Sequence, residues 1–168
     1  LYGATKLASD KVFIVSNAYS GEHLTRFSVV RYGNVMGSRG SVIPFFHSLK
    51  DTGEIPITDT RMTRFMITLE QGVEFVLAAF EDSMGGEIYV KKIPSMNIVD
   101  LAKSVVPDVK HKIIGIRPGE KLHEQMVSTE DSYHTFEYEN YYKILPSIYN
   151  SSNESKRING GKKCPEGF

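Results

Sequence analysis

The sequence predicts an α/β fold built around a parallel sheet, and three observations lead to this prediction. Strand-like apolar runs alternate with helical patterns along most of the chain. The clearest strand candidate, residues 27–32, is short, apolar and β-branched, as strands buried on both faces usually are. It follows a helical pattern over residues 5–19 and ends at the turn Gly33-Asn34. This order of elements is typical of a parallel α/β sheet.

The first part of the chain alternates helix, strand and turn. The helix over 5–19 ends near Gly21, and we expect Asp10 and Lys11 on its polar side. Its apolar residues share the opposite side: Ala4, Leu7, Ala8, Val12 and Val15. After the strand comes the glycine-rich turn Gly37-Ser38-Arg39-Gly40-Ser41, and a short helix over 44–49 follows it. Gly53 then leads into an extended segment, residues 55–59.

The second part repeats the alternation. Thr68 is expected to cap a helix over 69–81, and Asn97 a helix over 98–105. Strands are expected over 87–90 and 112–116, and a further helical stretch over 122–127. Beyond Ser132 the chain becomes aromatic and irregular, and from residue 147 it is rich in Ser, Asn, Gly and Lys, which predicts a loop or mobile tail.

Composition excludes several classes of function. Among 168 residues, 20 Lys and Arg balance 20 Asp and Glu, so a nucleic-acid or membrane-surface role lacks its electrostatic signature. One cysteine, Cys164, excludes an internal disulfide, and no apolar stretch is long enough to span a bilayer. The five histidines are scattered without ligand spacing, so we predict no metal site, and Ser9 and Ser41 lack the partners of a hydrolase. We expect a cytoplasmic protein.

The residues with the most chemical content stand at the start of the chain. Tyr2 and Lys6 are four residues apart, so a helix places them on one face. A phenol has a pKa of about 10, and a nearby cation lowers it. Tyr2 is therefore a candidate general acid/base, although an ordinary amphipathic helix would also explain the pair. The chain opens inside this motif without a methionine, and we expect the natural chain to be longer at this end.

Four segments in order resemble those of one family. They are Tyr2-Gly3-Ala4-Thr5-Lys6-Leu7-Ala8-Ser9-Asp10-Lys11, the run from Arg31 through Asn34 to Pro44, Ile57-Thr58-Asp59 with Arg61-Met62-Thr63-Arg64-Phe65, and Arg117-Pro118-Gly119-Glu120-Lys121-Leu122-His123-Glu124. Together they resemble the inverting UDP-N-acetylglucosamine 4,6-dehydratases of the extended short-chain dehydrogenase/reductase superfamily. Four long motifs in one order are far more specific than the Tyr-x-x-x-Lys spacing by itself.

The resemblance implies the second half of a Rossmann-like doubly wound parallel sheet with a smaller α/β substrate-binding domain. Residues 1–40 and 56–93 would form the C-terminal half of the dinucleotide-binding domain. Residues 41–55 and 94–146 would form the nucleotide-sugar domain, and 147–168 an irregular tail. The glycine-rich cofactor loop is not found in the sequence and would lie upstream. The chain as given would then be inactive by itself.

The resemblance also implies a redox-neutral reaction with NADP as the cofactor, NAD remaining open. Carbon 4 of UDP-N-acetylglucosamine is oxidised transiently, water is lost across carbons 5 and 6, and carbon 5 is inverted. Tyr2 would take the proton of the carbon 4 hydroxyl, and Lys6 would lower its pKa and hold the nicotinamide ribose. The family's Asp-Lys pair for the elimination would precede the tyrosine motif. The product would feed pseudaminic acid or related surface glycans, and we expect a homo-oligomer.

Further site residues follow from the resemblance. The nicotinamide wall would comprise Val35, Met36, Gly37, Ser38 and Arg39, and substrate contacts would come from Asn34, Val42, Thr58, Arg117 and Glu120. A guanidinium suits a diphosphate and a carboxylate suits a ribose diol. Simple turns at Gly33-Asn34 and Arg117–Glu120 are the structural alternatives.

Three further questions stay open at this stage. Arg61 and Arg64 could add positive potential near phosphates, but a structural role is the preferred interpretation. The aromatic residues from Tyr133 to Tyr142 could stack on bases, but they lack interleaved basic residues, so packing or a subunit contact is preferred. The alternatives to a dehydratase are a nucleotide-sugar 4-epimerase of the same superfamily and a non-catalytic nucleotide-sugar-binding fragment.

Overall fold

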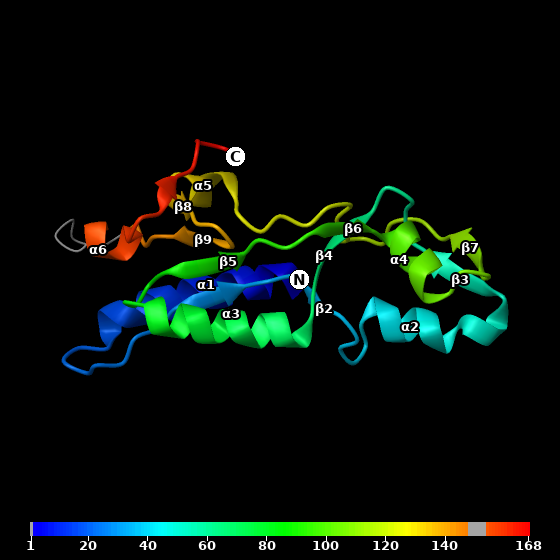
Figure 1. Cartoon of the computed structure of the whole chain (residues 1–168), viewed down its shortest axis with the longest axis horizontal. Helices are drawn as coiled ribbons and strands as arrows, with labels where there is room; N and C mark the ends of the chain where they lie inside the picture. Colours follow the sequence, from blue (N-terminus) through cyan, green and yellow to red (C-terminus); the bar gives the residue numbers. More distant parts are fainter. Residues whose placement is uncertain (1, 148–153) are drawn as a thin grey trace. The chain divides into compact units, whose positions relative to one another are not determined.

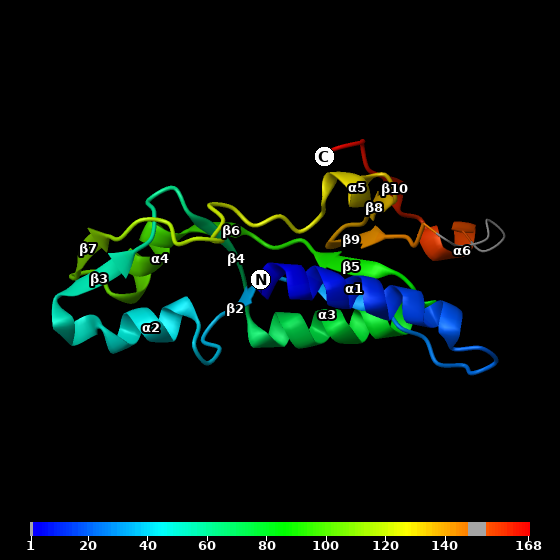
Figure 2. The ribbon, with the colours of Figure 1, turned by 180° about the vertical axis from the view of Figure 1, so that it is seen from behind.

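The chain forms two compact units. The structure is a computed structural model that describes residues 2–147 and 154–168, and at Tyr2 and Gly3 it describes the helix alone. Unit 1 contains the residues up to Arg31, residues 73–92 and those from Met126 onward, and unit 2 contains residues 32–72 and 93–125. Figures 1 and 2 show the elements of both units from opposite sides.

Unit 1 is built on a sheet of five strands. Their order is β1 (Val29–Arg31), β5 (Ile88–Lys91), β9 (Tyr141–Ile144), β8 (Thr135–Glu137) and β10 (Lys162–Lys163). The strands β1 and β5 pair in parallel, which confirms the predicted α/β class, whereas the remaining pairs are antiparallel. The β8–β9 hairpin falls where the sequence predicted irregular structure.

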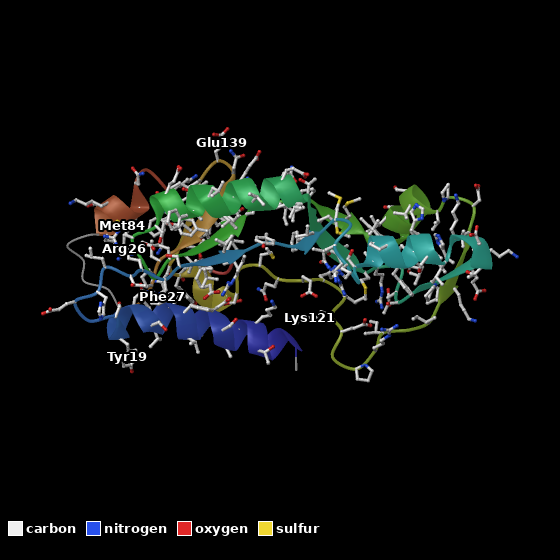
Figure 3. All side chains as sticks on the ribbon, turned by 90° about the horizontal axis from the view of Figure 1, so that it is seen from below. Tyr19, Arg26, Phe27, Met84, Lys121 and Glu139 are labelled. Atoms are coloured by element: carbon white, nitrogen blue, oxygen red, sulfur yellow. The ribbon has the colours of Figure 1, made fainter. Side chains whose placement is uncertain are left out.

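Two long helices cover opposite faces of this sheet. On one face, Ile14 of α1 (Tyr2–Tyr19) packs into the cluster that contains Val29. On the other, Phe75 and Ala79 of α3 (Leu69–Asp82) pack with Val30. Neighbouring residues of a strand point to opposite faces, and Figure 3 shows β1 between the two helices. The short helices α5 (Thr129–Ser132) and α6 (Glu154–Ile158) complete unit 1.

The helix α1 turns a different side to the sheet from the one expected. Leu7, Val12 and Val15 are 54%, 63% and 43% exposed, so they do not form the buried side. Asp10, expected to be solvated, forms an ion pair with Arg31 of β1 at 2.9 Å. The ion pair directs the Asp10 side of the helix toward the sheet, and the spacing of apolar residues does not predict this.

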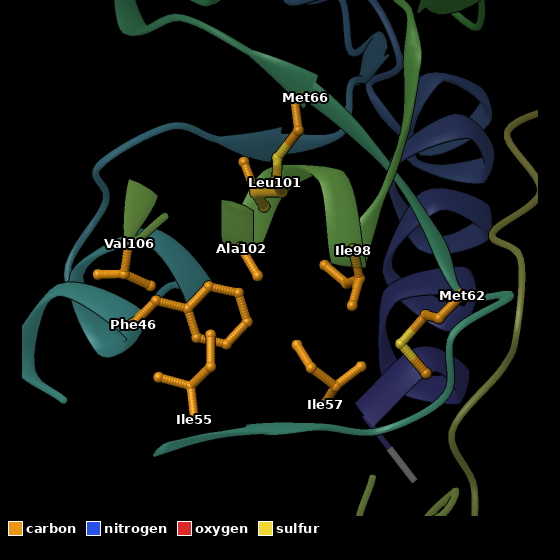
Figure 4. Packing of buried hydrophobic residues seen from close by; sticks show 9 residues of the cluster. All are labelled: Phe46, Ile55, Ile57, Met62, Met66, Ile98, Leu101, Ala102 and Val106. Carbon is orange, nitrogen blue, oxygen red and sulfur yellow. The ribbon is translucent and has the colours of Figure 1, made fainter. Parts of the chain in front are cut away.

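Unit 2 contains two small sheets with a core between their elements. One has the order β2 (Asn34–Val35), β4 (Thr63–Ile67), β6 (Ser95–Asn97), and the other pairs β3 (Glu54–Ile57) in parallel with β7 (Lys110–Ile113). The helices are α2 (Val42–Ser48), α4 (Ile98–Val105) and the 3₁₀ turn η1 (Lys50–Thr52). The buried core, drawn in Figure 4, consists of Phe46, Ile55, Ile57, Met62, Met66, Ile98, Leu101, Ala102 and Val106.

Both predicted helix caps are confirmed. Thr68 Oγ1 accepts from Gln71 N at 3.2 Å, and Gln71 Oε1 accepts from Thr68 N at 3.1 Å, which forms a reciprocal capping box for α3. Asn97 Oδ1 accepts from Val99 N at 2.8 Å at the start of α4. Each cap and its partner are two or three residues apart, so the sequence alone could predict both.

The helix predicted over 122–127 is wrong. Leu122 O, which would accept from residue 126 in a helix, instead accepts from Thr63 N at 3.0 Å and from Arg64 Nη1 at 3.1 Å. Bonds to β4 therefore replace the bonds of a helix, and the segment between β7 and α5 is irregular.

The tail and the domain division also differ from expectation. Residues 148–153 of the expected tail lie outside the described residues, but α6 and β10 give its remainder regular structure. Residues 32–40 and 56–72, expected in the first domain, group with unit 2, in which β3 and β4 pair with β7 and β6. Residues 126–146, expected in the second domain, group with unit 1. None of the helices in the described ranges combines the length and apolar character that a membrane crossing requires.

Gly33 is required by a close backbone approach inside unit 2. A Cβ at this position would lie 2.3 Å from Phe65 O, so Gly33→Ala must displace backbone. We expect a loss of roughly 1–3 kcal/mol in the free energy of unfolding, measured with denaturant on the full-length protein. Gly72→Ala is the control, because nothing lies within 4 Å of its Cβ position in α3, and a gain of about 0.5–1 kcal/mol is expected there. Equal effects of the two changes would contradict this reading.

Candidate active site

The Tyr2–Lys6 pair begins the helix α1. Both positions are helical, so the four-residue spacing places them on one face within about one turn. Lys6 is exposed. Further along the helix, Asp10 is held by Arg31, whose Nη1 also donates to Asp131 Oδ2 at 2.8 Å and to Met126 O at 3.1 Å. Arg31 thus ties the helix that carries the pair to the sheet and to α5.

The glycine-rich turn after β2 lies where a parallel strand ends. Asn34 and Val35 pair in parallel with Met66 and Ile67 of β4, and Asn34 is exposed. Beyond the strand, Met36 N donates to Ile67 O at 2.9 Å, and the chain turns through glycines 37 and 40, with φ values of 73° and 76°. Residues 36–40 are all exposed. Ligands of α/β proteins bind at this end of parallel strands.

Thr58 and the Arg117–Glu120 segment follow the two strands of the other parallel pair. Ile57 of β3 is opposite Ile113 of β7, and Ile114 N donates to Ile57 O at 2.9 Å. The residues that follow therefore emerge at the same edge of this sheet. Val42 is instead the first residue of α2 and packs against the core of unit 2.

The segment Arg117-Pro118-Gly119-Glu120 forms a tight turn. Glu120 N donates to Arg117 O at 3.0 Å, and Gly119 has φ 87°, which matches a type II turn with proline at its second and glycine at its third position. Glu120 Oε2 accepts from Arg117 N at 3.0 Å. Arg117 itself is exposed. The turn alternative considered for this segment is therefore correct as a description of the backbone, and it leaves the guanidinium accessible.

An ion pair stands next to Thr58. Arg61 Nε and Nη2 donate to the two carboxylate oxygens of Asp59 at 3.0 and 2.8 Å. These bonds, with a further bond from Arg61 N, lower the pKa of Asp59 to about 2. Because a carboxylate already engages Arg61, the structural interpretation of this residue is favoured over a phosphate contact.

The predicted residues are divided between the units. Lys6, with Tyr2 in the same helix, belongs to unit 1. The predicted residues of unit 2 are Asn34, Val35, Met36, Gly37, Ser38, Arg39, Val42, Thr58, Arg117 and Glu120. In the described part of the chain, no group of three His, Cys, Asp or Glu side chains could hold a metal ion.

Comparison with known proteins identifies the family. The model of the polysaccharide biosynthesis protein family matches residues 1–146. The chain belongs to this family. It is 58% identical, over a 175-residue alignment that includes all of this chain, to a UDP-N-acetylglucosamine 4,6-dehydratase (inverting) of Campylobacter jejuni. The resemblance stated from the four motifs is thereby confirmed. The chain spans 52% of that relative's length.

The chain is also similar to a curated epimerase and to a solved structure. A UDP-glucose 4-epimerase of Rickettsia bellii is 42% identical over 147 residues, with 84% of this chain and 43% of the epimerase covered. The solved structure of Pen from Bacillus thuringiensis is 34% identical and superposes with a TM-score of 0.85, with 99% of this chain and 50% of Pen covered. The α/β fold is therefore shared with an experimentally determined structure.

The sequence patterns did not predict the contacts of two arginines. Arg31 lies on the half-buried strand β1, and an arginine inside an apolar run is a signal for a partly buried ion pair. For Arg64 a structural role is the preferred interpretation from sequence, and the structure supplies the partners: its guanidinium donates to three backbone carbonyls. These partners are distant in sequence, and a local pattern could not identify them.

Proposed function

We propose that the full-length protein is a lyase that removes water from UDP-N-acetylglucosamine to give a UDP-4-keto-6-deoxy-hexosamine, with inversion at carbon 5. The observation that carries the proposal is the 58% identity across the whole chain to the Campylobacter jejuni dehydratase. The placement of Tyr2 and Lys6 in the first turns of α1 supports it, because the helix gives the pair the spacing that acid/base chemistry requires.

The residues present fit part of a nicotinamide dinucleotide site. The turn over 36–40 is exposed at the end of a parallel strand, as such sites require. Next to it, Ser41 Oγ is buried and has no hydrogen-bond partner among the residues that the structure describes, so it could pair with a ligand. Val35 to Arg39 would form a wall of the site, and Lys6 would hold the ribose. When bound, the nicotinamide supplies reversible hydride acceptance.

The chain's own residues would act on protons and on orientation. Tyr2 would accept the proton of the carbon 4 hydroxyl while carbon 4 becomes a carbonyl, and Lys6 would stabilise the phenolate. The carbonyl would make the hydrogen on carbon 5 acidic enough for loss of water across carbons 5 and 6. Return of the hydride to carbon 6 and of a proton to carbon 5 would then give the 4-keto-6-deoxy product and leave the cofactor oxidised again. Asn34, Val42 and Thr58 would contact the sugar nucleotide, and Arg117 and Glu120 its diphosphate and ribose.

The finer assignments are proposals of the same kind. We propose NADP as the cofactor, a cytoplasmic homo-oligomer as the working form, and pseudaminic acid or related glycans as the destination of the product. Light scattering of the purified full-length protein would give the mass of the assembly, and the released cofactor would be identified after denaturation.

A 4-epimerase is the second candidate function. The 42% identity to the Rickettsia bellii epimerase favours it, and that reaction needs the same tyrosine and lysine but no loss of water. The lower identity makes it the weaker candidate.

Product identification separates the two functions. The full-length protein would be incubated with UDP-N-acetylglucosamine and the mixture followed by proton NMR. We expect a methyl doublet from a 6-deoxy product. The appearance of UDP-N-acetylgalactosamine, with the N-acetyl singlet but no new methyl doublet, would reject the dehydratase and support the epimerase.

A further inference from the structure

The segment that carries Arg117 and Glu120 has no regular structure of its own. Between the end of β7 at Ile113 and the start of α5 at Thr129, the backbone is turn, bend or irregular. Its first turn is closed internally by the bonds between Arg117 and Glu120. Those bonds set the shape of the turn but not its position, so its position requires contacts with a rigid element.

Two residues of β4 supply these contacts. Arg64 Nη1 donates to Thr63 O at 2.7 Å and to Leu122 O at 3.1 Å, and its Nη2 donates to Lys121 O at 3.1 Å. Thr63 N donates to Leu122 O at 3.0 Å, and Thr63 Oγ1 is 2.7 Å from His123 Nδ1. We call Thr63 and Arg64 the β4 clamp. It holds the chain directly after Glu120, and Figure 3 labels the clamped Lys121.

The β4 clamp holds the segment by directed hydrogen bonds to backbone carbonyls and not by pairing with an opposite charge. The Arg64 side chain is 15% exposed, and its Nη atoms are directed at backbone carbonyls. Its Nε lies 4.0 Å from the carboxylate oxygen Oε1 of Glu124, too far for a close ion pair. A planar guanidinium can bridge several carbonyls at fixed angles, whereas the ammonium of lysine is a point donor on a flexible stem.

We propose that Arg64, assisted by Thr63, is a positioning residue that holds the Arg117–Glu120 turn ready for the nucleotide. This inference rests on the proposed function, in which that turn binds the diphosphate and the ribose. A turn that must be ordered during binding lowers affinity, because the entropy of ordering is then lost on association. Loss of the clamp should therefore weaken substrate binding while leaving the chemical step intact.

Steady-state kinetics of the full-length protein with UDP-N-acetylglucosamine tests the proposal. For Arg64→Lys we expect KM to rise roughly tenfold, with kcat within about twofold of wild type. Roughly tenfold is the loss of affinity that corresponds to ordering one flexible group during binding. Thr63→Val, a milder change that keeps the backbone donor, should raise KM less. Arg61→Lys is the matched control and should leave KM unchanged, since Arg61 pairs with Asp59. A wild-type KM for Arg64→Lys would overturn the proposal, because charge would then suffice.

Amide hydrogen exchange without substrate separates the clamp from the function. In Arg64→Lys, the amides of residues 117–124 should exchange faster, while those of α4 keep their protection and show that the variant is folded. Unchanged exchange over 117–124 would overturn the clamp. Faster exchange with unchanged KM would overturn the positioning role. If wild type itself binds no UDP-sugar, the proposed function fails and the positioning role fails with it, whatever the exchange result.

Discussion

Tyr2→Phe in the full-length protein is expected to lower kcat for UDP-N-acetylglucosamine by about 10²–10⁴-fold, the range that general acid/base groups usually contribute. Phenylalanine keeps the ring and removes the hydroxyl that would accept the proton from the carbon 4 hydroxyl. The affinity for the substrate should stay within about twofold, because Arg117 and Glu120 are proposed to hold the nucleotide. Turnover would be measured from product formation, and affinity by calorimetry.

Tyr19→Phe is the matched control for this prediction. Tyr19 ends the same helix, is 84% exposed, and is labelled in Figure 3. Its replacement should leave kcat unchanged. Retained turnover in Tyr2→Phe would remove Tyr2 from the chemistry, and an equal loss in both variants would indicate damage to the helix.

Arg157→Met is expected to lower the free energy of unfolding by about 3–5 kcal/mol, the usual consequence of leaving a buried charge unpaired. Arg157 of α6 forms an ion pair with Glu87, and the two side chains are 9% and 1% exposed. Its Nη1 also donates to Gly85 O at 2.8 Å, and Arg157 O accepts from the buried Lys143 Nζ at 2.8 Å. Without the guanidinium, Glu87 keeps weaker contacts with the hydroxyls of Ser28 and Ser83, at 3.2 and 3.3 Å.

Urea unfolding of the full-length protein would measure this loss. Arg61→Met is the matched control, since its ion pair with Asp59 has an arginine side chain that is 69% exposed, and exposed pairs contribute about 0–1 kcal/mol. The double variant Glu87→Gln/Arg157→Met should recover part of the loss, because no buried charge then lacks a partner. A loss as small as that of Arg61→Met would show that the pair does not hold the C-terminal segment.

The sequence predicted the elements whose signals are local. The caps at Thr68 and Asn97 and the run over residues 27–32 gave α3, α4 and β1 nearly at their observed bounds. The hairpin β8–β9 was missed because its pairing with β5 depends on residues about fifty positions away. Its aromatic residues pack, as the preferred interpretation held: the rings of Tyr138 and Tyr141 stack with centroids 4.5 Å apart.

Polar contacts over long sequence distances account for the other differences. The pattern over 122–127 satisfies a helix, but the carbonyls of Lys121 and Leu122 are bound by Arg64. The polar composition after residue 147 predicts a loop, but Arg157 pairs with a buried carboxylate seventy residues earlier. The candidate site was predicted from motifs, and the structure adds the contacts of Arg31 and of the β4 clamp. These residues lie in the motifs, but several of their partners are 57 to 100 residues away in the sequence.

The fate of the hydrogen on carbon 4 tests the central proposal most directly. UDP-N-acetylglucosamine deuterated at carbon 4 would be incubated with the full-length protein, and the product examined by deuterium NMR and mass spectrometry. A dehydratase moves the label to carbon 6, so the account predicts a product with one deuterium in its methyl group. Deuterium retained at carbon 4 of an epimerised sugar would contradict it.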